Sequence, residues 1–355
     1  TASPSRSRRL ARRAAAPAGV VLAGLVIYLV WRHSYHGGLV PNTVMVKGGL
    51  TASRLVRGGR YAMVFFLTFL TPFAILPGAV CSVKRWGRLG AAVSGVFIAA
   101  VGYSVLVGGD FMAMGRFLVV GMPFMAIAIG CMLQRAWERS GSRRGAALSV
   151  VVAAIVLVGA LPAWNVHVVP EQARSLFHFR YGSQVFRSEM EQWQTMRRNS
   201  EQWGVIGRAL KEHSRVGDSV VVGAIGNIGY YSGLFIYDVC GLVSPEVASL
   251  PPRPGLSPGH DKAVSPLFFF DRDPTYLYVE LVRGPDLAAP VLKHIGQWEV
   301  PAADTSYVPD LIPVPGADSR GRRRALLLCR RLEPGGSGSE AWESLFSALG
   351  EVAGM

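Results

Sequence analysis

The sequence predicts an α-helical polytopic membrane region of about five spans, followed by a small extracytoplasmic α/β domain. Half of the 355 residues are hydrophobic and only 17% are charged, whereas soluble domains carry about 25% charged residues. The formal net charge is +14, but the positive charge lies in the first half. Residues 1–163 hold 18 Lys and Arg among long apolar runs, against two acids, Asp110 and Glu138. Because the basic helices and interleaved aromatic residues of nucleic-acid modules are missing from this pattern, it indicates a membrane protein with no nucleic-acid partner.

Five stretches of 17–20 residues without a charged side chain are predicted to cross the membrane as helices. A helix needs about 20 apolar residues to cross roughly 30 Å of hydrocarbon, and lipid offers no partners for free backbone groups. The stretches are residues 14–31, 61–80, 89–107, 117–133 and 146–164. The first is too long for a signal peptide and has no small-residue cleavage pattern after it, so we expect a retained helix.

The basic residues between these stretches predict the orientation of the chain. Arginines and lysines gather in residues 6–13, 84–88 and 135–144, which therefore share one side of the membrane. The positive-inside rule assigns that side to the cytoplasm and the rest of the chain to the outer side of the cell (inner) membrane. The predicted domains are a cytoplasmic basic tail (1–13), the transmembrane region (14–164), an interfacial linker (165–199), the extracytoplasmic α/β domain (200–332) and a flexible tail with a short amphipathic helix (333–355).

One of the outer loops, residues 32–60, carries cations of its own. Arg54, Arg57 and Arg60 recur there at three-residue spacing. This spacing predicts a short helix that lies on anionic lipid headgroups.

The second half of the chain has the pattern of a small α/β domain. Ser200 is the expected N-cap of a helix over residues 200–214, whose apolar residues share one face. Buried strands are predicted at residues 219–225, 234–239, 275–282 and 324–330. A tight Gly-rich turn is expected between the first two strands, because the G-x-G-x-x-G spacing of a dinucleotide loop is absent.

The four cysteines indicate little chemistry. Cys81 and Cys131 lie at the ends of predicted spans, where we expect them to pack. Cys240 and Cys329 lie in or beside predicted strands of the exported domain, where a disulfide is chemically allowed but is not fixed by sequence separation. No Cys/His spacing indicates zinc. No cofactor is identified, and a divalent metal is left open.

The loops on the outer side carry the candidate chemistry. Asp110 is the only carboxylate that the membrane half presents there. Beside Arg116 and within reach of Lys47, this carboxylate could hold a sugar hydroxyl or orient a phosphate-binding cation, and Arg and Lys at that depth suit a lipid phosphate. The alternative is a tight turn in which Asp110 caps the fourth span. For His36, near the membrane surface, interfacial packing and substrate contact are both open.

Several motifs of the outer segments resemble those of one family. They are H-x-x-x-x-P-N-x-x-x-x-K at 36–47, G-G-D-F-M-x-x-x-R-F at 108–117, G-x-x-x-Y-Y-S-G at 226–233 continued by D-x-x-G-L at 238–242, and G-H-x-K at 259–262. Together they resemble the polytopic GT-C glycosyltransferases, in the branch that contains the terminal arabinofuranosyltransferases of actinobacterial cell walls. The resemblance covers about residues 31–332.

The resemblance implies a polyprenyl-phosphate-linked sugar as donor and a cell-envelope glycan or glycolipid as acceptor, joined on the extracytoplasmic face. In that chemistry a base deprotonates the acceptor hydroxyl while cations stabilise the departing lipid phosphate. Lys47 and Arg116 are then the candidates for the phosphate, and Asp110 is the candidate catalytic or sugar-binding carboxylate. The other candidate substrate-binding residues are His36, Asn42, Tyr230, Tyr231 and Asp238.

The sequence departs from this family in its first part. Family members begin with a span and an outer loop whose acids are taken to include the catalytic base, whereas no Asp or Glu precedes Asp110 here. We therefore expect the C-terminal portion of a longer enzyme, with Asp110 as the base only if the chain is complete. The alternative is a shortened homologue that binds glycolipid without turnover. A lipid-carrier translocator or an envelope scaffold is the rival class, although the spans hold almost none of the polar groups that a translocator needs.

Overall fold

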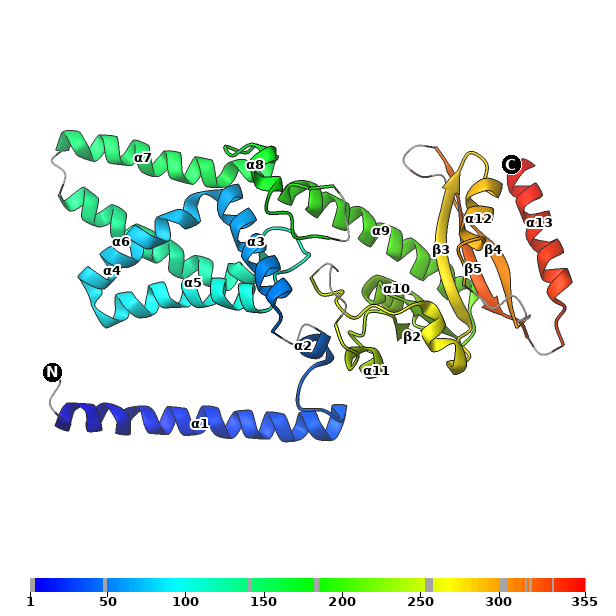
Figure 1. The fold of residues 1–355 in the computed structure, drawn as a ribbon, viewed down its shortest axis with the longest axis horizontal. Helices are drawn as coiled ribbons and strands as arrows, with labels where there is room; N and C mark the ends of the chain where they lie inside the picture. The colour runs from blue at the N-terminus through cyan, green and yellow to red at the C-terminus, as the bar shows by residue number, and fades with distance from the viewer. Residues whose placement is uncertain are drawn as a thin grey trace.

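The computed structural model describes residues 4–46, 50–139, 142–181, 185–252, 258–299, 306–316, 318, 321–333 and 335–354. The molecule is elongated, with a helical region at one end and an α/β domain at the other (Figure 1). The helix α9 (Glu189–His213) extends from the first region into the second. The chain therefore has the two-part architecture, helices first and then a mixed domain, that the sequence predicts.

Apolar helices build the first region. They are α1 (Pro4–His36), α3 (Ala52–Phe69), α4 (Ile75–Trp86), α5 (Arg88–Leu106), α6 (Met122–Glu138) and α7 (Ser142–Ala160), joined by the short helices α2 (Asn42–Val46), η1 (Thr71–Ala74), η2 (Arg116–Gly121) and η3 (Leu161–Trp164). Three stretches are long and apolar enough to cross a membrane, namely Ala15–His36, Arg88–Leu106 and Arg116–Glu138. These helices indicate that the chain associates with a membrane.

The second predicted span, residues 61–80, is not a straight helix. The axis turns by 97° between α3 and the η1–α4 pair, which form either a broken span or a re-entrant loop. Leu70, at the break, has a positive φ of 58°, and Pro72 follows in the first turn of η1. Because proline has no N–H and favours the first turn of a new helix, it ends α3 here. The prediction of one unbroken helix is therefore wrong.

The span count depends on this bent pair. Among the described residues, three helices meet the length and composition of a span, and four do so if the bent pair is counted as one. The last apolar helix, Val150–Trp164, is shorter than the others. The fifth span thus stays a prediction.

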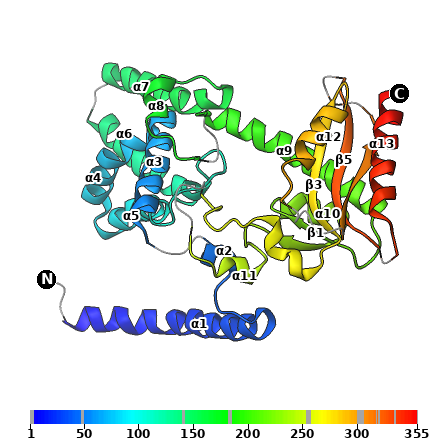
Figure 2. The same ribbon diagram turned by 45° about the vertical axis from the view of Figure 1, so that its right-hand side comes forward.

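Glycines let the helices of this region approach one another closely. A Cβ placed on Gly58 of α3 would overlap the backbone of Val105 in α5, and one on Gly90 of α5 would overlap that of Ser82 in α4. Small residues at such crossings are the usual packing device of membrane helices, where lipid gives no hydrophobic driving force. α1 is different, because it lies apart from the bundle (Figure 2) and no residue of its apolar stretch is buried.

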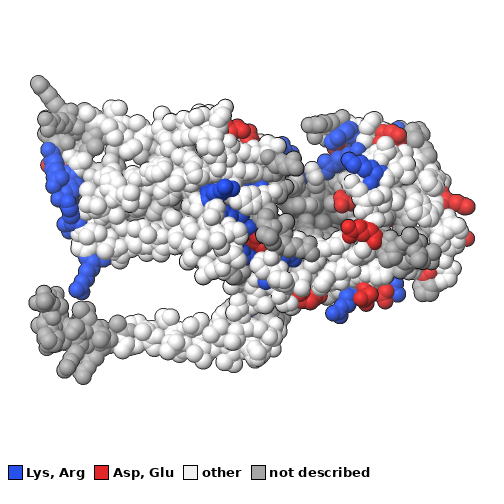
Figure 3. All heavy atoms as spheres, viewed as in Figure 1, with Lys and Arg blue, Asp and Glu red and all other residues white. Residues whose placement is uncertain are grey.

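The basic turns of the bundle lie at one end. Arg85, in the last turn of α4, forms a 2.9 Å ion pair with Glu138, the last residue of α6. Lys and Arg side chains gather at this end of the helical region, away from the α/β domain (Figure 3). The two described basic segments therefore share one side of the bundle, as their charge predicts.

The helix α9 begins earlier than expected. Its N-cap is Ser188, whose hydroxyl accepts from the Glu191 N–H at 3.2 Å while the Glu191 carboxylate accepts from the Ser188 N–H at 2.9 Å. This reciprocal capping box satisfies two otherwise unpaired donors of the first turn. The predicted start at Ser200 is wrong, because only the apolar face of residues 200–214 was considered and the S-x-x-E signal before it was not. The preceding linker contains α8 (Glu171–Ser175).

A five-stranded mixed sheet forms the α/β domain. Its strands are β1 (Ser219–Val222), β2 (Phe235–Asp238), β3 (Tyr276–Gly284), β4 (Tyr307–Val314) and β5 (Arg323–Arg331), in the order β2-β1-β3-β5-β4. β1 pairs in parallel with β2 and β3, whereas β5 lies antiparallel between β3 and β4. The four predicted strands are present with shifted ends. The sequence reading missed β4, an edge strand that contains two prolines.

Helices cover both faces of this sheet. α9 and α10 (Ile225–Ser232) pack on the face that carries Val220, Leu326 and Leu328. α12 (Ala288–Ile295) and α13 (Gly338–Gly354) pack on the opposite face, with α11 (Pro245–Ala248) and η4 (Pro266–Arg272) beside them. The expected tight turn between the first two strands is thus the helix α10. The expected tail contains a longer helix than predicted, and this helix buries Leu345 against the sheet.

Candidate functional site

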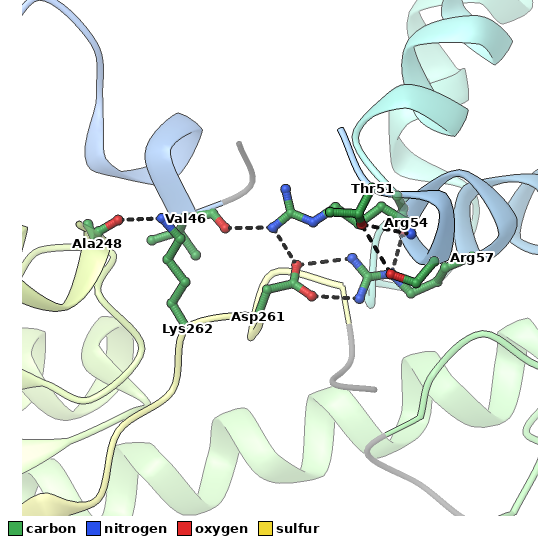
Figure 4. A network of polar contacts seen from close by, with 9 residues as sticks. Val46, Thr51, Arg54, Arg57, Ala248, Asp261 and Lys262 are labelled. Carbon is green, nitrogen blue, oxygen red and sulfur yellow. Dashed lines mark hydrogen bonds and ion pairs between the residues drawn. The ribbon is translucent and has the colours of Figure 1, made fainter. Parts of the chain in front are cut away.

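Two arginines at the start of α3 join the helical region to the α/β domain. Arg57 donates to both carboxylate oxygens of Asp261, Nη1 to Oδ1 at 2.7 Å and Nη2 to Oδ2 at 3.0 Å. Arg54 donates to Oδ2 of the same carboxylate at 3.2 Å (Figure 4). All three residues are 3% exposed. Charge-assisted, forked contacts of this kind are the strongest hydrogen bonds that side chains make.

The same two guanidinium groups bind the ends of both outer loops. Arg54 donates to the Val46 carbonyl at 3.2 Å, at the end of α2, and the N-cap Thr51 accepts from the Arg54 N–H. Arg57 donates through Nε to the Gly108 carbonyl at 2.9 Å. The stretches 36–46, 108–116 and 258–262 therefore meet at one buried network, which we call the junction network (Arg54, Arg57, Asp261).

The headgroup role predicted for the three spaced arginines is wrong for this network. Arg54 and Arg57 are buried and paired with Asp261, because a buried guanidinium needs a carboxylate or carbonyls around it. Arg60 donates to the His178 carbonyl at 3.4 Å and to the Tyr181 hydroxyl at 3.2 Å. The three-residue spacing therefore indicates a helix, as predicted, but the cations on it contact other parts of the protein and not lipid headgroups.

A second buried ion pair holds the loop that carries Asp110. Arg180 pairs with Glu189 at 2.8 Å and donates to the Phe111 carbonyl at 3.0 Å, while the Glu189 carboxylate accepts from the Met114 N–H. The loop also needs its glycines, since Gly108 and Gly109 have φ near +80° and a Cβ on Gly109 would lie 2.8 Å from that of Tyr61. The backbone around Asp110 is therefore fixed by contacts on several sides.

The carboxylate of Asp110 is buried, and only one of its two oxygens has a hydrogen-bond partner among the described residues. Its Oδ2 accepts from Arg116 Nε at 2.7 Å, whereas its Oδ1 is buried and has no partner among the described residues. The carboxylate is 1% exposed, but the Arg116 side chain is 48% exposed and lies over the Phe117 ring. The capping alternative is not observed, because Gly115 precedes η2 and no side chain caps that helix. A buried carboxylate oxygen without a donor is costly, so this oxygen is suited to accept a hydrogen bond from a ligand.

The loop also contacts the α/β domain through rings. The Phe111 ring lies 5.0 Å from the His260 ring, and His260 Nδ1 lies 3.5 Å from Cys240 Sγ. Burial raises the pKa of the Cys240 thiol to about 11, so this thiol is neutral at physiological pH. Both Cys240 and Cys329 are buried free thiols, and the open question of a disulfide is answered in the negative for this pair.

Lys262 lies next to the junction network. Its Nζ donates to the Ala248 carbonyl at 2.6 Å (Figure 4). Burial, followed by the nearby Arg54 charge, lowers the pKa of Lys262. This lysine thus ties the segment of Asp261 to α11, which itself contacts α2.

The remaining predicted site residues lie elsewhere. Asp238 is fully buried, and its two oxygens accept from the Cys240 and Val243 N–H groups at 2.8 and 2.9 Å, which gives it a turn-forming role. Tyr230, 83% exposed, and Tyr231 lie on α10, with Arg208 of α9 over the Tyr231 ring. The junction network contains none of these three residues.

Two predicted site residues of the first outer loop lie in its described part. His36 is exposed at the end of α1, 4.8 Å from the Tyr35 ring, and Asn42 is the half-buried first residue of α2. Lys47 lies outside the described residues. Among the residues that the structure describes, no three His, Cys, Asp or Glu side chains gather as metal ligands do.

Sequence reasoning missed the residues that build the site. Arg180 and Glu189 carry no local signal of their pairing. Asp261 lies in the G-H-x-K motif, and Arg54 and Arg57 have the spacing of one helix face, so the signals were present. The partners of these residues could not be predicted from the sequence, because two residues that pair across 204 positions leave no local pattern.

Comparison with known proteins gives one match. A family model described as "Domain of unknown function (DUF8728)" matches residues 188–321. The matched segment begins at the N-cap of α9 and contains Asp261, but it ends before β5. No curated protein and no solved structure matches the chain. The chain thus combines apolar helices that indicate association with a membrane with an α/β domain. Over α9 and most of that domain it is similar to a family without an assigned function.

Proposed function

We propose that this chain works in a membrane glycosyltransferase of the GT-C type, which transfers a sugar from a polyprenyl-phosphate donor to a cell-envelope glycan or glycolipid. One observation carries the proposal. Three of the stretches on which the family resemblance rests, 36–46, 108–117 and 259–262, meet at the junction network although they lie far apart in sequence. Segments that form one substrate site are expected to converge in this way.

The position of the site also fits a lipid-linked donor. The junction network joins the first turns of α3 to the α/β domain. The basic side chains of the bundle gather at the end that lies away from that domain (Figure 3). By the positive-inside rule the end nearer that domain faces the extracytoplasmic side. A sugar on a lipid phosphate is presented at that depth, where its chain stays in the bilayer and its phosphate is at the surface.

Asp110 and Arg116 supply the chemistry in this proposal. The donor phosphate attracts the half-exposed Arg116 guanidinium away from Asp110, because phosphate accepts two hydrogen bonds from one guanidinium. Asp110 is then free to accept a hydrogen bond from a hydroxyl of the acceptor or the donor sugar. Arg116, together with Lys47, stabilises the negative charge of the departing polyprenyl phosphate.

The second candidate is a protein that binds glycolipid, translocates a lipid carrier or serves as an envelope scaffold without turnover. The Asp110–Arg116 pair favours it, because the Arg116 guanidinium occupies Oδ2 of Asp110 at 2.7 Å, and this oxygen can bind no substrate hydroxyl until the pair is broken. The two candidates differ in whether the sugar leaves its carrier.

A transfer assay separates them. The full-length protein that contains this chain is reconstituted in lipid vesicles with short-chain polyprenyl-phosphate sugars, pentose and hexose, and with neutral oligosaccharide acceptors. Acceptor-dependent release of polyprenyl phosphate supports the transferase. Binding of the donor without release supports the non-catalytic candidate and contradicts the proposal.

A further inference from the structure

The α/β domain has a hollow that none of the predicted site residues line. It has a volume of 690 Å³ and is lined by the end of α9 at His213 and by residues of β3, β4 and β5, among them Asp310 and Arg330. A second hollow of 470 Å³ shares several of its residues and continues along α13. Volumes of about 300–1,000 Å³ are typical of small-molecule sites. The residues that line the hollow belong to the end of α9 and to the α/β domain, and none of them comes from the bundle helices.

The charges around this hollow cancel. Arg330 pairs with Asp310 across β5 and β4 at 3.0 Å, and Arg215 pairs with Glu333 at 2.8 Å. Arg331 lies 3.7 Å from Asp273. An anionic ligand would have to displace these carboxylates or lie against them, so the hollow is not a phosphate or polyanion site.

Much hydrogen-bonding capacity nevertheless faces the hollow. Arg330 uses only Nε for its ion pair among the described residues, which leaves two planar –NH₂ groups, and one oxygen of Asp310 accepts that bond. His213 donates through Nδ1 to the Ala209 carbonyl at 2.8 Å, which leaves its Nε2 available among the described residues. Arg330 and Asp310 are about one-third exposed, which leaves them accessible while the pair keeps them in place.

A peptide strand is a poor occupant. β4 is an edge strand, and pairing with a further strand needs backbone N–H donors along that edge. Pro309 and Pro313 have none, and proline is tolerated in a ladder only where its nitrogen faces away from the neighbouring strand. The free edge beside the hollow is therefore short of donors.

We propose that this hollow binds an uncharged, hydroxyl-rich glycan. Paired guanidinium and carboxylate groups can donate to and accept from neighbouring hydroxyls of one sugar without a net charge on either side. The second hollow extends the site enough for further sugar units. The identity of this glycan rests on the proposed function. If that function holds, the glycan is the acceptor, and the hollow binds it at a distance from the Asp110 loop.

Titration by saturation-transfer NMR tests this proposal on the full chain in detergent micelles. The probes are neutral arabino- and manno-oligosaccharides and, as the charged comparison, an oligogalacturonate. We expect at least one neutral probe to bind, and Arg330→Ala and Asp310→Ala to weaken it about tenfold or more, the scale of a lost charge-assisted contact. Arg330→Lys and Asp310→Asn are expected to weaken it less. These two conservative variants distinguish the loss of a contact from the loss of the fold. Thermal unfolding of every variant shows whether it is folded.

The control is Arg197→Ala, which breaks an exposed ion pair with Glu201 on α9 outside the hollow. It should leave binding unchanged. Tighter binding of the charged probe, no binding of any neutral probe, or equal binding by wild type and Arg330→Ala would overturn the proposal. The titration contains no donor, so its result is independent of sugar transfer. Glycan binding here, combined with no release of polyprenyl phosphate in the transfer assay above, would refute the transferase and leave the glycan site standing.

Discussion

Arg57 and Asp261 lie 204 positions apart in the sequence and form a forked, buried ion pair between the first helix of the bundle and the α/β domain. Through Nε the same guanidinium holds the Gly108 carbonyl, two residues from Asp110. Arg57 therefore contributes both to the position of the Asp110 loop and to the attachment of the α/β domain. A single charge change at this point should affect both.

Replacing Asp261 is the clearest test of this attachment. Asp261→Ala leaves two buried guanidinium groups without their carboxylate, and breaking a buried pair in this way costs about 3–5 kcal/mol. Asp261→Asn keeps the size and some hydrogen bonds and should cost less. Chemical denaturation in detergent micelles measures the free energy of unfolding. Glu201→Ala, which removes an exposed pair, is the control and should cost less than about 1 kcal/mol. Equal losses for Asp261→Ala and Glu201→Ala would mean that the network does not stabilise the protein.

The orientation of the chain can be tested with fusions. A reporter that is active only in the cytoplasm should stay dark after residue 355 and after Leu332, and should be bright in the α4–α5 turn after Gly87. The reason is that the basic turns and the α/β domain lie at opposite ends of the bundle (Figure 3). A bright signal after residue 355 would reverse the orientation, and the extracytoplasmic function would be refuted with it.

Stability should fall in mild acid because of His178. Burial, assisted by the charges of Arg180 and Arg60, lowers the pKa of His178 in the folded protein. The unfolded state then binds more protons below about pH 6.5, the ordinary histidine value, so stability is full above that pH and declines as the pH falls through the lower, folded value. The melting temperature of wild type should therefore drop more between pH 7.5 and pH 5 than that of His178→Phe, whose ring suits the nearby Phe186. If the melting temperatures of the two proteins fell equally with pH, His178 would be excluded as the cause of the loss of stability in acid.

Local features were largely readable from the sequence. The apolar runs and the basic turns predicted the helical region, because span length and charge bias are properties of single segments. The proximity of Asp110 and Arg116 was also predictable, since they are six residues apart in one loop. The break at Leu70 was not predicted, although Pro72 marked the place, because membrane helices tolerate proline in many positions.

Long-range features were not readable. β4 was missed because Pro309 and Pro313 argue against a strand unless it is known to lie at an edge, and edge position is a property of the whole sheet. The roles of Arg54 and Asp261 were missed for the same reason, since neither residue identifies its partner. Asp238 was chosen as a substrate contact, yet its oxygens are used by the turn that follows β2.

The phosphate role of the two outer cations predicts a graded loss of donor affinity. Each charge-assisted contact to a phosphate contributes about 1.5–3 kcal/mol, so Arg116→Ala should weaken binding of a short-chain polyprenyl phosphate roughly tenfold or more. Arg116→Lys should weaken it less, because it keeps the charge and loses the planar fork. Lys47→Ala should act in the same direction. Arg139→Ala, at the basic end of the bundle, controls for general attraction to anionic lipid. Equal affinity in wild type and the Arg116→Ala/Lys47→Ala double variant would remove both residues from the phosphate site.

The rate of sugar transfer in Asp110→Asn tests the central claim most directly. The substitution keeps the size of the side chain and removes the charge, so the loop should stay folded while the carboxylate loses its function. In vesicles that hold the complete enzyme containing this chain, with polyprenyl-phosphate sugar and acceptor, transfer should fall by about 10²-fold or more, the scale of a lost general base or oriented charge. Asp286→Asn, an exposed residue whose side chain accepts from the Ala288 N–H, should transfer at the wild-type rate. Equal rates for wild type and Asp110→Asn would contradict the claim that this loop is the catalytic site.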